Sequence, residues 1–414
     1  MNSQSSIKAP LSIWSFVFGF ILIFSFFTQK LSLDIGFHLK AFMFFSAFTL
    51  FYISVTKVKV NFIFELHDLI LLIFILYGGT TVIYAADQLS TLRMFFGSLI
   101  IFFCYFSVKL FFINYSFKIS DVERLLYFAS LSFIIISLIM YFYGMYIIAG
   151  DFQSYEHIRV SGVYVERATP RLIGLALDPN IFVVFVTPIF FYLLLKINKN
   201  IFDFIALTLT VLCILLSLSR GGILAILSVV LMLFFLKSII ALVNGILNKK
   251  ILTWLLILSI VFIFIFHSLD IHSNISSIIE RRISSIADGS GRVDIWKNLL
   301  SLWAENPIFG IGWYNFLHYN IELFDRANYA HNTYLEVLVE TGLVGFTLYT
   351  SFILVIIHRV ITLVYQKPEL NYLLYSLLSI LVSFVFLSLI INEIFFLLLA
   401  IISIFSYKTK LNNA

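Results

Sequence analysis

The run IFDFIALTLTVLCILLSLSRGGILAILSVVLMLFFL, from Ile201 to Leu236, decides the fold class of this chain. It is largely apolar except for the hexapeptide SLSRGG at Ser217 to Gly222. Each half is just long enough to cross a bilayer as a helix, because a span needs roughly 20 apolar residues. The bilayer core holds no water to satisfy free backbone groups, so runs of this length form helices. The run therefore predicts two spanning helices joined by a polar turn.

The same apolar character extends over the whole chain. Hydrophobic residues make up 61% of its 414 residues and charged residues only 12%, and a soluble protein could not cover its surface with this composition. We predict an all-α polytopic membrane protein, in which residues 1–414 form a single integral membrane domain with about twelve spans. The predicted spans are residues 11–28, 38–56, 66–84, 94–114, 125–149, 177–195, 201–217, 221–237, 251–267, 334–357, 371–390 and 392–406.

Several simpler readings are excluded by the sequence. The first apolar segment lacks a small-residue cleavage site and runs straight into further spans, so it does not read as a cleavable signal peptide. Cys104 and Cys213 both fall inside predicted spans, without the spacing of a metal site or the context of a disulfide. Membrane lipids surround such a chain, and we expect no nucleic-acid partner.

Basic residues predict which side of the membrane each loop faces. With the N-terminus in the cytoplasm, the short loops KVKVN, KINKN and NKK and the tail YKTK all lie inside, as the positive-inside rule requires. Both termini are then cytoplasmic, and two polar loops, residues 150–176 and the large loop 268–333, face outward. We expect the large loop to carry short amphipathic helices.

Inside, the cations are nearly all Lys, whereas outside they are nearly all Arg. The planar guanidinium of Arg matches phosphate oxygens bidentately. The outer Arg set therefore predicts a phosphate-bearing ligand. The alternative is that these residues bind lipid headgroups or pair with nearby carboxylates.

Arg220 stands in the polar turn of the opening run. A charge at mid-bilayer costs roughly 2.5–3.5 kcal/mol on insertion scales, so an Arg in a sunken turn requires a partner or an aqueous cavity. Gly221 and Gly222 would let the backbone turn and approach a ligand closely. The alternative is a snorkelling Arg at an ordinary hairpin turn.

The loop at 150–176 and the start of the following span supply three further polar candidates for substrate binding, Arg159, Arg171 and Asn180. Pro179 is expected to prevent a clean helix start at this point. Asn180 could then offer amide contacts to a sugar. The alternative is a plain turn before a span.

The large loop opens with Arg281 and Arg282 and continues as GRVDIW from Gly291. Between Arg292 and Glu305 the apolar residues, two Trp among them, recur at helical spacing. This pattern predicts a short amphipathic helix lying on the outer leaflet, although simple membrane anchoring would explain it too. Arg292 stands at its N-terminal end, where the helix dipole favours anions.

His331 and Asn332 close the large loop just before the next span. A His at the mouth of a cavity can exchange a proton near neutral pH, although a lone His near a span end is usually only interfacial. Glu336 and Glu340 follow one and two turns into the span, on one helix face. Together with the two arginines, His331 becomes a candidate catalytic base and Glu336 its catalytic partner.

No DxD-like carboxylate pair occurs in the predicted outer loops. The arginines could neutralise a leaving pyrophosphate in place of a divalent metal. We therefore predict a metal-independent site with no cofactor.

The motifs SRGG, GRVDIW, ENPIFGIGWYNF and HNTYLEVLVETGLVG, in this order and spacing, resemble those of the bacterial O-antigen ligase and O-antigen polymerase superfamily. The resemblance covers most of the chain from Arg159 to Gly345. It implies a GT-C-like inner-membrane glycosyltransferase that uses undecaprenyl-diphosphate-linked glycans at the periplasmic face. The family's motif arginines map onto Arg220 and Arg292 and its motif histidine onto His331.

The resemblance also implies a mechanism. An acceptor sugar hydroxyl attacks the anomeric carbon of the donor, while Arg220 and Arg292 hold the diphosphate and His331 orients or deprotonates the hydroxyl. Glu336 would set the tautomer of the histidine. The remaining candidates would bind substrate: Arg171, whose family match is looser, Asn180, Arg159, Asn332, Arg281 and Arg282.

The motifs leave the acceptor open. A polymerase uses a second lipid-linked repeat, with a chain-length regulator as an expected protein partner, whereas a ligase uses a sugar of the lipid A core. We favour the polymerase, with the ligase as the alternative. A membrane solute transporter and a non-enzymatic subunit of an export complex are the rivals from other classes, and the absence of a clear internal repeat argues against the transporter.

Overall fold

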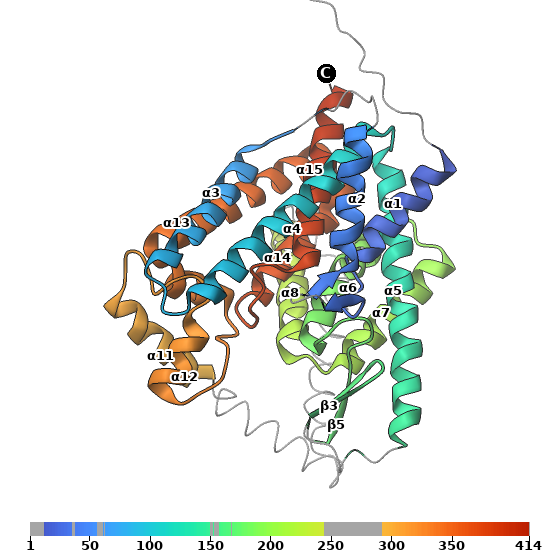
Figure 1. Ribbon diagram of the computed structural model, residues 1–414. Coiled ribbons are helices and arrows are strands. Elements are labelled where there is room, and N and C mark those ends of the chain that lie inside the picture. Colours follow the sequence, from blue (N-terminus) through green and yellow to red (C-terminus); the bar gives the residue numbers. More distant parts are fainter. Residues whose placement is uncertain are drawn as a thin grey trace, which may run out of the picture.

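Long apolar helices build most of the computed structural model (Figure 1). The structure describes residues 12–34, 38–55, 61, 63–149, 152, 157–166, 168–243 and 292–413. The predicted span 251–267 and the candidate residues Arg281 and Arg282 lie outside these described residues.

Every predicted span within the described residues corresponds to a helix. These helices are α1 (Ile13–Ser25), α2 (Ala41–Val55), α3 (Leu66–Thr80), α4 (Gln88–Asn114), α5 (Ile119–Ile148), α6 (Pro179–Leu195), α7 (Ile201–Ser217), α8 (Arg220–Val243), α13 (Thr333–Gln366), α14 (Asn371–Ser383) and α15 (Glu393–Asn413). Five stretches in the described part are long and apolar enough to cross a bilayer, namely Leu66–Ile83, Gln88–Asn114, Ile119–Ile148, Thr333–Gln366 and Glu393–Leu411. The helices have the character of a multi-pass membrane protein, while the twelve spans and the GT-C-like arrangement stay predictions.

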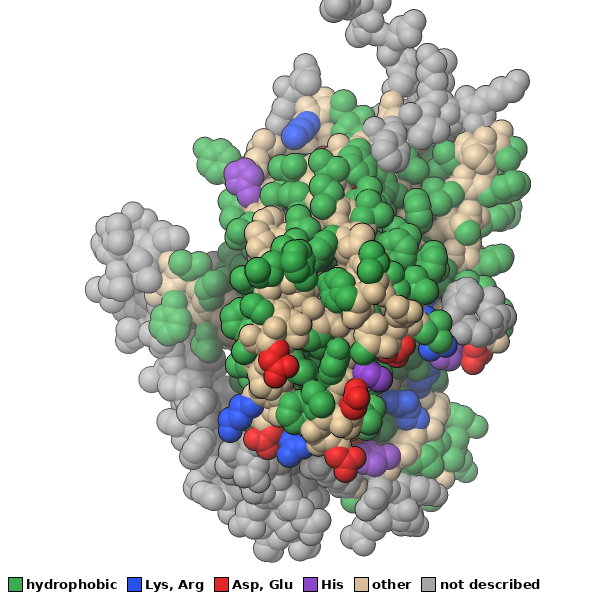
Figure 2. All heavy atoms as spheres, turned by 60° about the vertical axis from the view of Figure 1, so that its left-hand side comes forward, with side chains coloured by type: hydrophobic (Ala, Val, Ile, Leu, Met, Phe, Trp, Pro, Cys, Tyr) green, Lys and Arg blue, Asp and Glu red, His purple; other side chains and the backbone are tan. Residues whose placement is uncertain are grey.

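The surface agrees with a membrane setting. Large apolar side chains such as Phe51, Phe142 and Leu354 are exposed on α2, α5 and α13. Figure 2 shows hydrophobic side chains covering most of one face, with the charged side chains gathered toward one end. This pattern is the reverse of a soluble domain, in which a contiguous apolar surface of this extent would be unusual.

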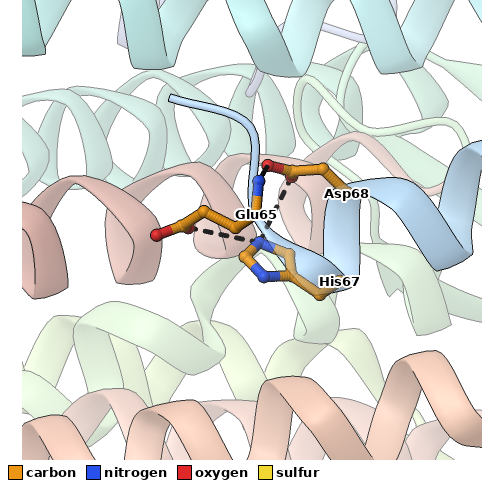
Figure 3. Close-up of side chains that lie close together, drawn as sticks. All are labelled: Glu65, His67 and Asp68. Carbon is orange, nitrogen blue, oxygen red and sulfur yellow. Dashed lines mark hydrogen bonds and ion pairs between the residues drawn. The ribbon is translucent and has the colours of Figure 1, made fainter. Parts of the chain in front are cut away.

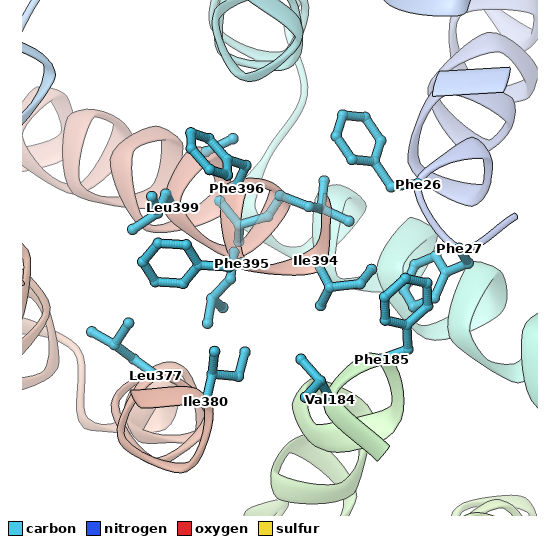
Figure 4. Packing of buried hydrophobic residues seen from close by; sticks show 14 of the residues in the cluster. Phe26, Phe27, Val184, Phe185, Leu377, Ile380, Ile394, Phe395, Phe396 and Leu399 are labelled. Carbon is cyan, nitrogen blue, oxygen red and sulfur yellow. The ribbon is translucent and has the colours of Figure 1, made fainter. Parts of the chain in front are cut away.

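The core between the helices is aromatic and aliphatic. Phe27 lies in the turn that follows α1. Its ring packs with those of Phe133 and Phe185, with centroid distances of 5.4 and 6.1 Å. Figure 4 shows buried side chains of α6, α14 and α15, among them Val184, Ile380 and Phe395, in the same cluster as Phe27 and Phe185. Buried packing of this kind fixes the helices against one another.

Two small antiparallel sheets, which the sequence analysis did not anticipate, stand in the loops. The first pairs β1 (Ser32–Asp34) with β2 (His38–Lys40), and the second has the order β3 (His157–Val160), β4 (Val163–Glu166), β5 (Thr169–Leu172). The three-stranded sheet lies at the end of the molecule opposite to the C-terminus, as do the short helices α11 (Arg292–Glu305) and α12 (Phe316–Phe324) (Figure 1).

Helix α6 begins cleanly at Pro179, so the expectation that this proline disturbs the helix start was wrong. Asp178 is the N-cap, and its Oδ1 accepts from the backbone amides of Asn180 at 2.7 Å and Ile181 at 3.3 Å. Proline suits the first helical position, because its fixed φ is helical and its missing N–H would be unpaired there anyway.

Helix α13 is kinked at Gly342, where φ is +63° and the helical hydrogen-bond ladder is interrupted. The loop at 306–312 inserts at this point. The amides of Ile311 and Gly312 donate to the carbonyls of Val339 and Glu340 at 3.1 and 3.0 Å, and the amide of Leu343 donates to the carbonyl of residue 307 at 2.9 Å. The kink therefore ties the large loop to the first two turns of α13.

Trp313 anchors the same loop on α3. It is fully buried, and a Cβ on Gly78 would lie only 2.1 Å from its ring, so α3 requires glycine at that position. The backbone amide of Trp313 donates to Thr81 Oγ1 at 2.9 Å. The motifs ENPIFGIGWYNF and HNTYLEVLVETGLVG are thus packed together and support the start of α13.

Candidate active site

The turn between α7 and α8 presents Arg220. Leu218 adopts a left-handed conformation (φ +48°) that ends α7, and Arg220 is the first residue of α8. Ser219 Oγ accepts from the amide of Gly222 at 3.2 Å and so caps the new helix. A Cβ on Gly222 would lie 2.7 Å from Val183 of α6, so this glycine is required by packing against protein.

Arg171 supports this turn from β5. Its guanidinium donates to the carbonyls of Ser217 at 3.1 Å and Leu218 at 3.5 Å, which are left free where α7 ends. It also pairs with Glu166 at 2.6 Å and lies 3.4 Å from Asn180 Oδ1. Since its donors are engaged with protein atoms, Arg171 positions the turn that carries Arg220.

Asn180 completes the support. Its Oδ1 accepts from Ser219 Oγ at 2.8 Å, so the start of α6 is joined directly to the turn before Arg220. Arg171 and Asn180, predicted as substrate contacts, are therefore found holding the backbone of the polar turn.

The predicted helix from Arg292 to Glu305 is confirmed with the same bounds as α11. Its buried face is formed by Ile295, Leu299 and Leu302, which pack against residues of α12, the following loop and α13, whereas Leu300 is exposed. The helix thus rests on protein along one face, and Arg292 stands at its first position.

Arg220, Arg292 and His331 come together although they lie far apart in the sequence. Burial lowers the pKa of Arg292, and the positive charge of Arg220 lowers it further. Burial likewise lowers the pKa of His331, followed by the charge of Arg292. The charge of Arg220 acts on Arg292, and the charge of Arg292 acts on His331. The three side chains are therefore close enough to form one electrostatic group.

Asp178 is the acidic member of this group, and sequence analysis did not select it. Its carboxylate opposes the lowering of the pKa of both Arg292 and His331. The signal that could have found it is its place before Pro179, because an Asp before a proline is a typical N-cap and holds its carboxylate at a helix end.

The backbone at His331 is held in an unusual conformation, with φ at +50°. On one side, Trp296 Nε1 of α11 donates to the carbonyl of Ala330 at 3.0 Å. On the other, Asn332 is the N-cap of α13, and its Oδ1 accepts from the amides of Tyr334 and Leu335, each at 3.1 Å. Asn332, predicted as a substrate contact, therefore fixes the peptide that presents His331.

Glu336 and Glu340 are both buried in α13 and bind backbone and hydroxyl groups. The Glu336 carboxylate accepts from Ser388 Oγ and lies beside the backbone amide of Ala330. The Glu340 carboxylate accepts from the amides of Tyr314 at 2.8 Å and residue 316 at 3.2 Å. Glu336 thus steadies the peptide next to His331, whereas its predicted role had been to orient the ring itself.

Arg159 stands apart from this group. It lies on β3 with its guanidinium 5.3 Å from the centre of the Tyr164 ring, and its charge acts on Lys30. It therefore belongs to a second basic region at the same end of the molecule.

Within the described residues, one group of side chains has the spacing of metal ligands: Glu65, His67 and Asp68, whose ligand atoms lie within 4.8 Å of one another (Figure 3). Lys109 Nζ lies 2.7 Å from Asp68 Oδ2, and Arg359 pairs with Glu65. These cations already neutralise the carboxylates. The group joins the start of α3 to the far end of α13, away from His331.

Residues 205–350 match the family model described as O-antigen ligase. This match supports the predicted membership in the O-antigen ligase and polymerase superfamily. The matched segment contains Arg220, Arg292 and His331 and supports an O-antigen ligase or polymerase type of function. A comparison with curated proteins found no match.

The O-antigen ligase segment does not contain the whole site. It includes α7, α8, α11, α12 and the first half of α13, but the supports Arg171 and Asn180 and the carboxylate of Asp178 precede it. Strand β5 and the start of α6 therefore complete a candidate site whose cationic residues lie in the matched segment.

Proposed function

We propose that the chain is a polysaccharide polymerase that transfers a glycan from undecaprenyl diphosphate to a sugar hydroxyl. The reaction would take place at the periplasmic face of the bacterial inner membrane, with both termini in the cytoplasm. The observation that carries the proposal is the grouping of Arg220, Arg292 and His331 around Asp178 within an O-antigen ligase segment.

The two arginines suit a diphosphate. Arg220 and Arg292 are close enough for one charge to lower the pKa of the other, and Arg292 is partly buried. An anion placed between two such groups relieves their repulsion, and guanidinium groups bind phosphate oxygens bidentately. As the bond from the anomeric carbon to the diphosphate breaks, negative charge grows on the leaving oxygen, and the arginines stabilise it.

His331 suits the acceptor. Because burial and Arg292 lower its pKa, the imidazole is neutral at physiological pH and can accept a proton. In the proposed step the acceptor hydroxyl gives its proton to a ring nitrogen of His331 while its oxygen bonds to the anomeric carbon. A positioned base contributes about 10²–10⁴ in rate.

The neighbouring residues would position these three. Arg171 and Asn180 hold the turn before Arg220, while Asn332, Trp296 and Glu336 hold the peptide of His331. A direct substrate contact by Arg171, Asn180, Asn332 or Arg159 stays a prediction, as does any role of Arg281 and Arg282.

The test separates donor binding from turnover. Purified protein in lipid nanodiscs is given an undecaprenyl-diphosphate-linked repeat, and donor affinity and chain growth are measured. We expect His331→Ala to lose turnover by about 10²-fold or more while it keeps donor affinity. Arg220→Ala should lose donor affinity.

Near wild-type turnover in His331→Ala would refute its role as the base. Transfer to lipid A core in preference to a lipid-linked repeat would identify a ligase, which is the alternative acceptor chemistry for the same site.

A further inference from the structure

Lys30 and Arg159 form a second pair of cations near the end of the molecule that carries His331. Lys30 lies between α1 and β1, and its ammonium donates to the carbonyl of Ser161 in the turn from β3 to β4. Its backbone amide donates to the carbonyl of Leu175 at 3.1 Å. Lys30 is therefore fixed to the sheet that presents Arg159.

Arg159 is held on the same sheet. Its partner in the β3–β4 register is Tyr164, and its guanidinium lies 5.3 Å from the centre of that ring. Burial, followed by the charge of Arg159, lowers the pKa of Lys30 to about 8. Two positive charges are thus kept near each other by backbone and aromatic contacts.

Two neighbouring cations at this end pair with carboxylates, whereas the described residues give Lys30 and Arg159 no such partner. Lys40 pairs with Glu393, and Arg171 pairs with Glu166. Among the residues that the structure describes, no carboxylate oxygen lies within 4.0 Å of the Lys30 or Arg159 nitrogens. Like charges held together without a counter-ion repel each other, and a bound anion would remove that repulsion.

This basic pair adjoins the proposed donor site. Gln29, next to Lys30, accepts from the amide of Leu177 at 3.2 Å, and the following residue is Asp178. Burial raises the pKa of Tyr164, and the charges of Arg159 and Asp178, both near its phenol, lower and raise it respectively. A ligand phosphate at the pair would therefore lie close to the group formed by Arg220, Arg292 and His331 but would not occupy it.

We propose that Lys30 and Arg159 bind the diphosphate of the acceptor, a second polyprenyl-diphosphate-linked glycan. The inference rests on the proposed polymerase function. A polymerase brings two lipid-linked diphosphates to one face of the membrane, so it requires two anion sites. The first would be the arginine pair of the donor site, and Lys30 with Arg159 would supply the second.

The experiment uses an acceptor that cannot act as donor, namely a repeat unit joined to polyprenyl diphosphate through a non-cleavable C-glycosidic bond. The same glycan as a methyl glycoside, without the diphosphate, is the comparison. Lys30→Met keeps the apolar stem and removes the charge, and Arg159→Leu does the same on β3. Lys297→Ala, an exposed cation on α11, is the matched control.

We expect each of the two variants to raise KM for the diphosphate acceptor by about tenfold to a hundredfold, as for the loss of one hydrogen bond to a charged group. KM for the methyl glycoside, kcat and donor affinity should change little, and the control should behave as wild type. An unchanged KM for the diphosphate acceptor, or an equal rise for both acceptors, would overturn the proposal.

Direct binding keeps this test separate from the proposed function. The C-glycosidic acceptor should still bind to a variant with Arg220→Ala and Arg292→Ala, in which the donor arginines are absent, and should be lost when Lys30→Met is added. If wild-type protein transferred no glycan but showed this binding pattern, the proposed transferase would fail and the diphosphate site would stand. Acceptor binding that disappears with the two arginines and ignores Lys30 would show that the second site does not exist.

Discussion

Two guanidinium groups that repel each other are the central feature at the scale of single residues. Burial lowers the pKa of Arg292 and the charge of Arg220 lowers it further, so a diphosphate bound between the two groups would relieve their repulsion. The planar fork of Arg can bind two oxygens of one phosphate, whereas the ammonium of Lys is a point charge. The specificity of the proposed site therefore depends on geometry as well as charge.

Arg220→Lys and Arg292→Lys should each lose most transferase activity, by about tenfold or more, because one bidentate contact to the diphosphate is replaced by a single one. The measurement is chain growth with a lipid-linked donor after equal membrane insertion has been verified. Arg326→Lys is the matched control, since Arg326 lies in the same large loop as Arg292 and, within the described residues, its side chain forms an exposed ion pair with Asp294 at 3.5 Å. Full activity in both site variants would show that charge alone is sufficient.

Burial and Arg292 lower the pKa of His331, and the Asp178 carboxylate partly opposes them. The base must be neutral to work, so kcat/KM should rise with pH through the pKa of His331, which lies below its ordinary value. The Asp178 carboxylate raises that pKa, so Asp178→Asn should lower it further and shift the rising limb to more acidic pH. The test is a pH–rate profile between pH 4.5 and 8, and a limb that moves to higher pH would contradict the assignment.

At the scale of elements, the kink in α13 decides where His331 and Glu336 stand. Gly342 has φ +63°, and a Cβ there would lie 2.2 Å from the carbonyl oxygen of Ile308. Gly342→Ala should therefore destabilise the fold by about 1–3 kcal/mol or more and loosen the large loop. Gly97→Ala is the control, because Gly97 is in a regular helix and a Cβ there meets only Ile391, at 3.9 Å.

The measurement is thermal unfolding in detergent, followed by recovery of monodisperse protein. Gly97→Ala should keep or slightly raise stability, since alanine favours helix. Equal melting of the two variants would show that the insertion of residues 306–312 does not depend on this backbone conformation.

The helices could be predicted from the sequence, but much of the site could not. Apolar runs and the 3.6-residue period gave α7, α8 and the bounds of α11, because burial in lipid or protein dictates them. The sheet β3–β5 was missed because its strands have only four residues each, although the alternation in HIRV and the following Ser161–Gly162 pair are a hairpin signal. Arg220, Arg292 and His331 could be predicted as site residues, because each is a charged or titratable residue close to a predicted span or amphipathic helix.

The roles of the residues that support the site could be recognised only from the folded structure. Arg171 was expected to meet a substrate, but the carbonyls that it binds become free only where α7 ends. Glu336 binds Ser388, far along the chain, and no local pattern reveals that contact. Asp178 was not selected, because its closeness to Arg292 and His331 is a property of the folded molecule.

At the scale of the whole molecule, the charge distribution bears on metal dependence. The group with metal-ligand spacing, Glu65, His67 and Asp68, is bound to Lys109 and Arg359 at the far end of α13. In the proposed mechanism the arginines neutralise the leaving diphosphate. Transfer should therefore survive EDTA within a factor of about two, and activity that is lost with the chelator and restored by magnesium or manganese would contradict this.

The two ends of the molecule should face opposite sides of the membrane. The short loops rich in Lys predict that the C-terminal end is cytoplasmic, and the sheet β3–β5 with α11 and α12 would then lie in the periplasm. Lys297 and Glu369 have well-exposed side chains at these two ends, and the native Cys104 and Cys213 are buried. Lys297→Cys and Glu369→Cys can therefore report the two sides in an otherwise unchanged protein.

In cells with a permeabilised outer membrane and an intact inner membrane, a membrane-impermeant maleimide should label Lys297→Cys. Glu369→Cys should be labelled only after the inner membrane is opened. The orientation matters for the proposed chemistry, because His331 and the two arginines lie at the same end as Lys297 and would have to meet a glycan that has already crossed the membrane. The opposite labelling pattern would place the site in the cytoplasm and would contradict the proposed transfer reaction in the periplasm.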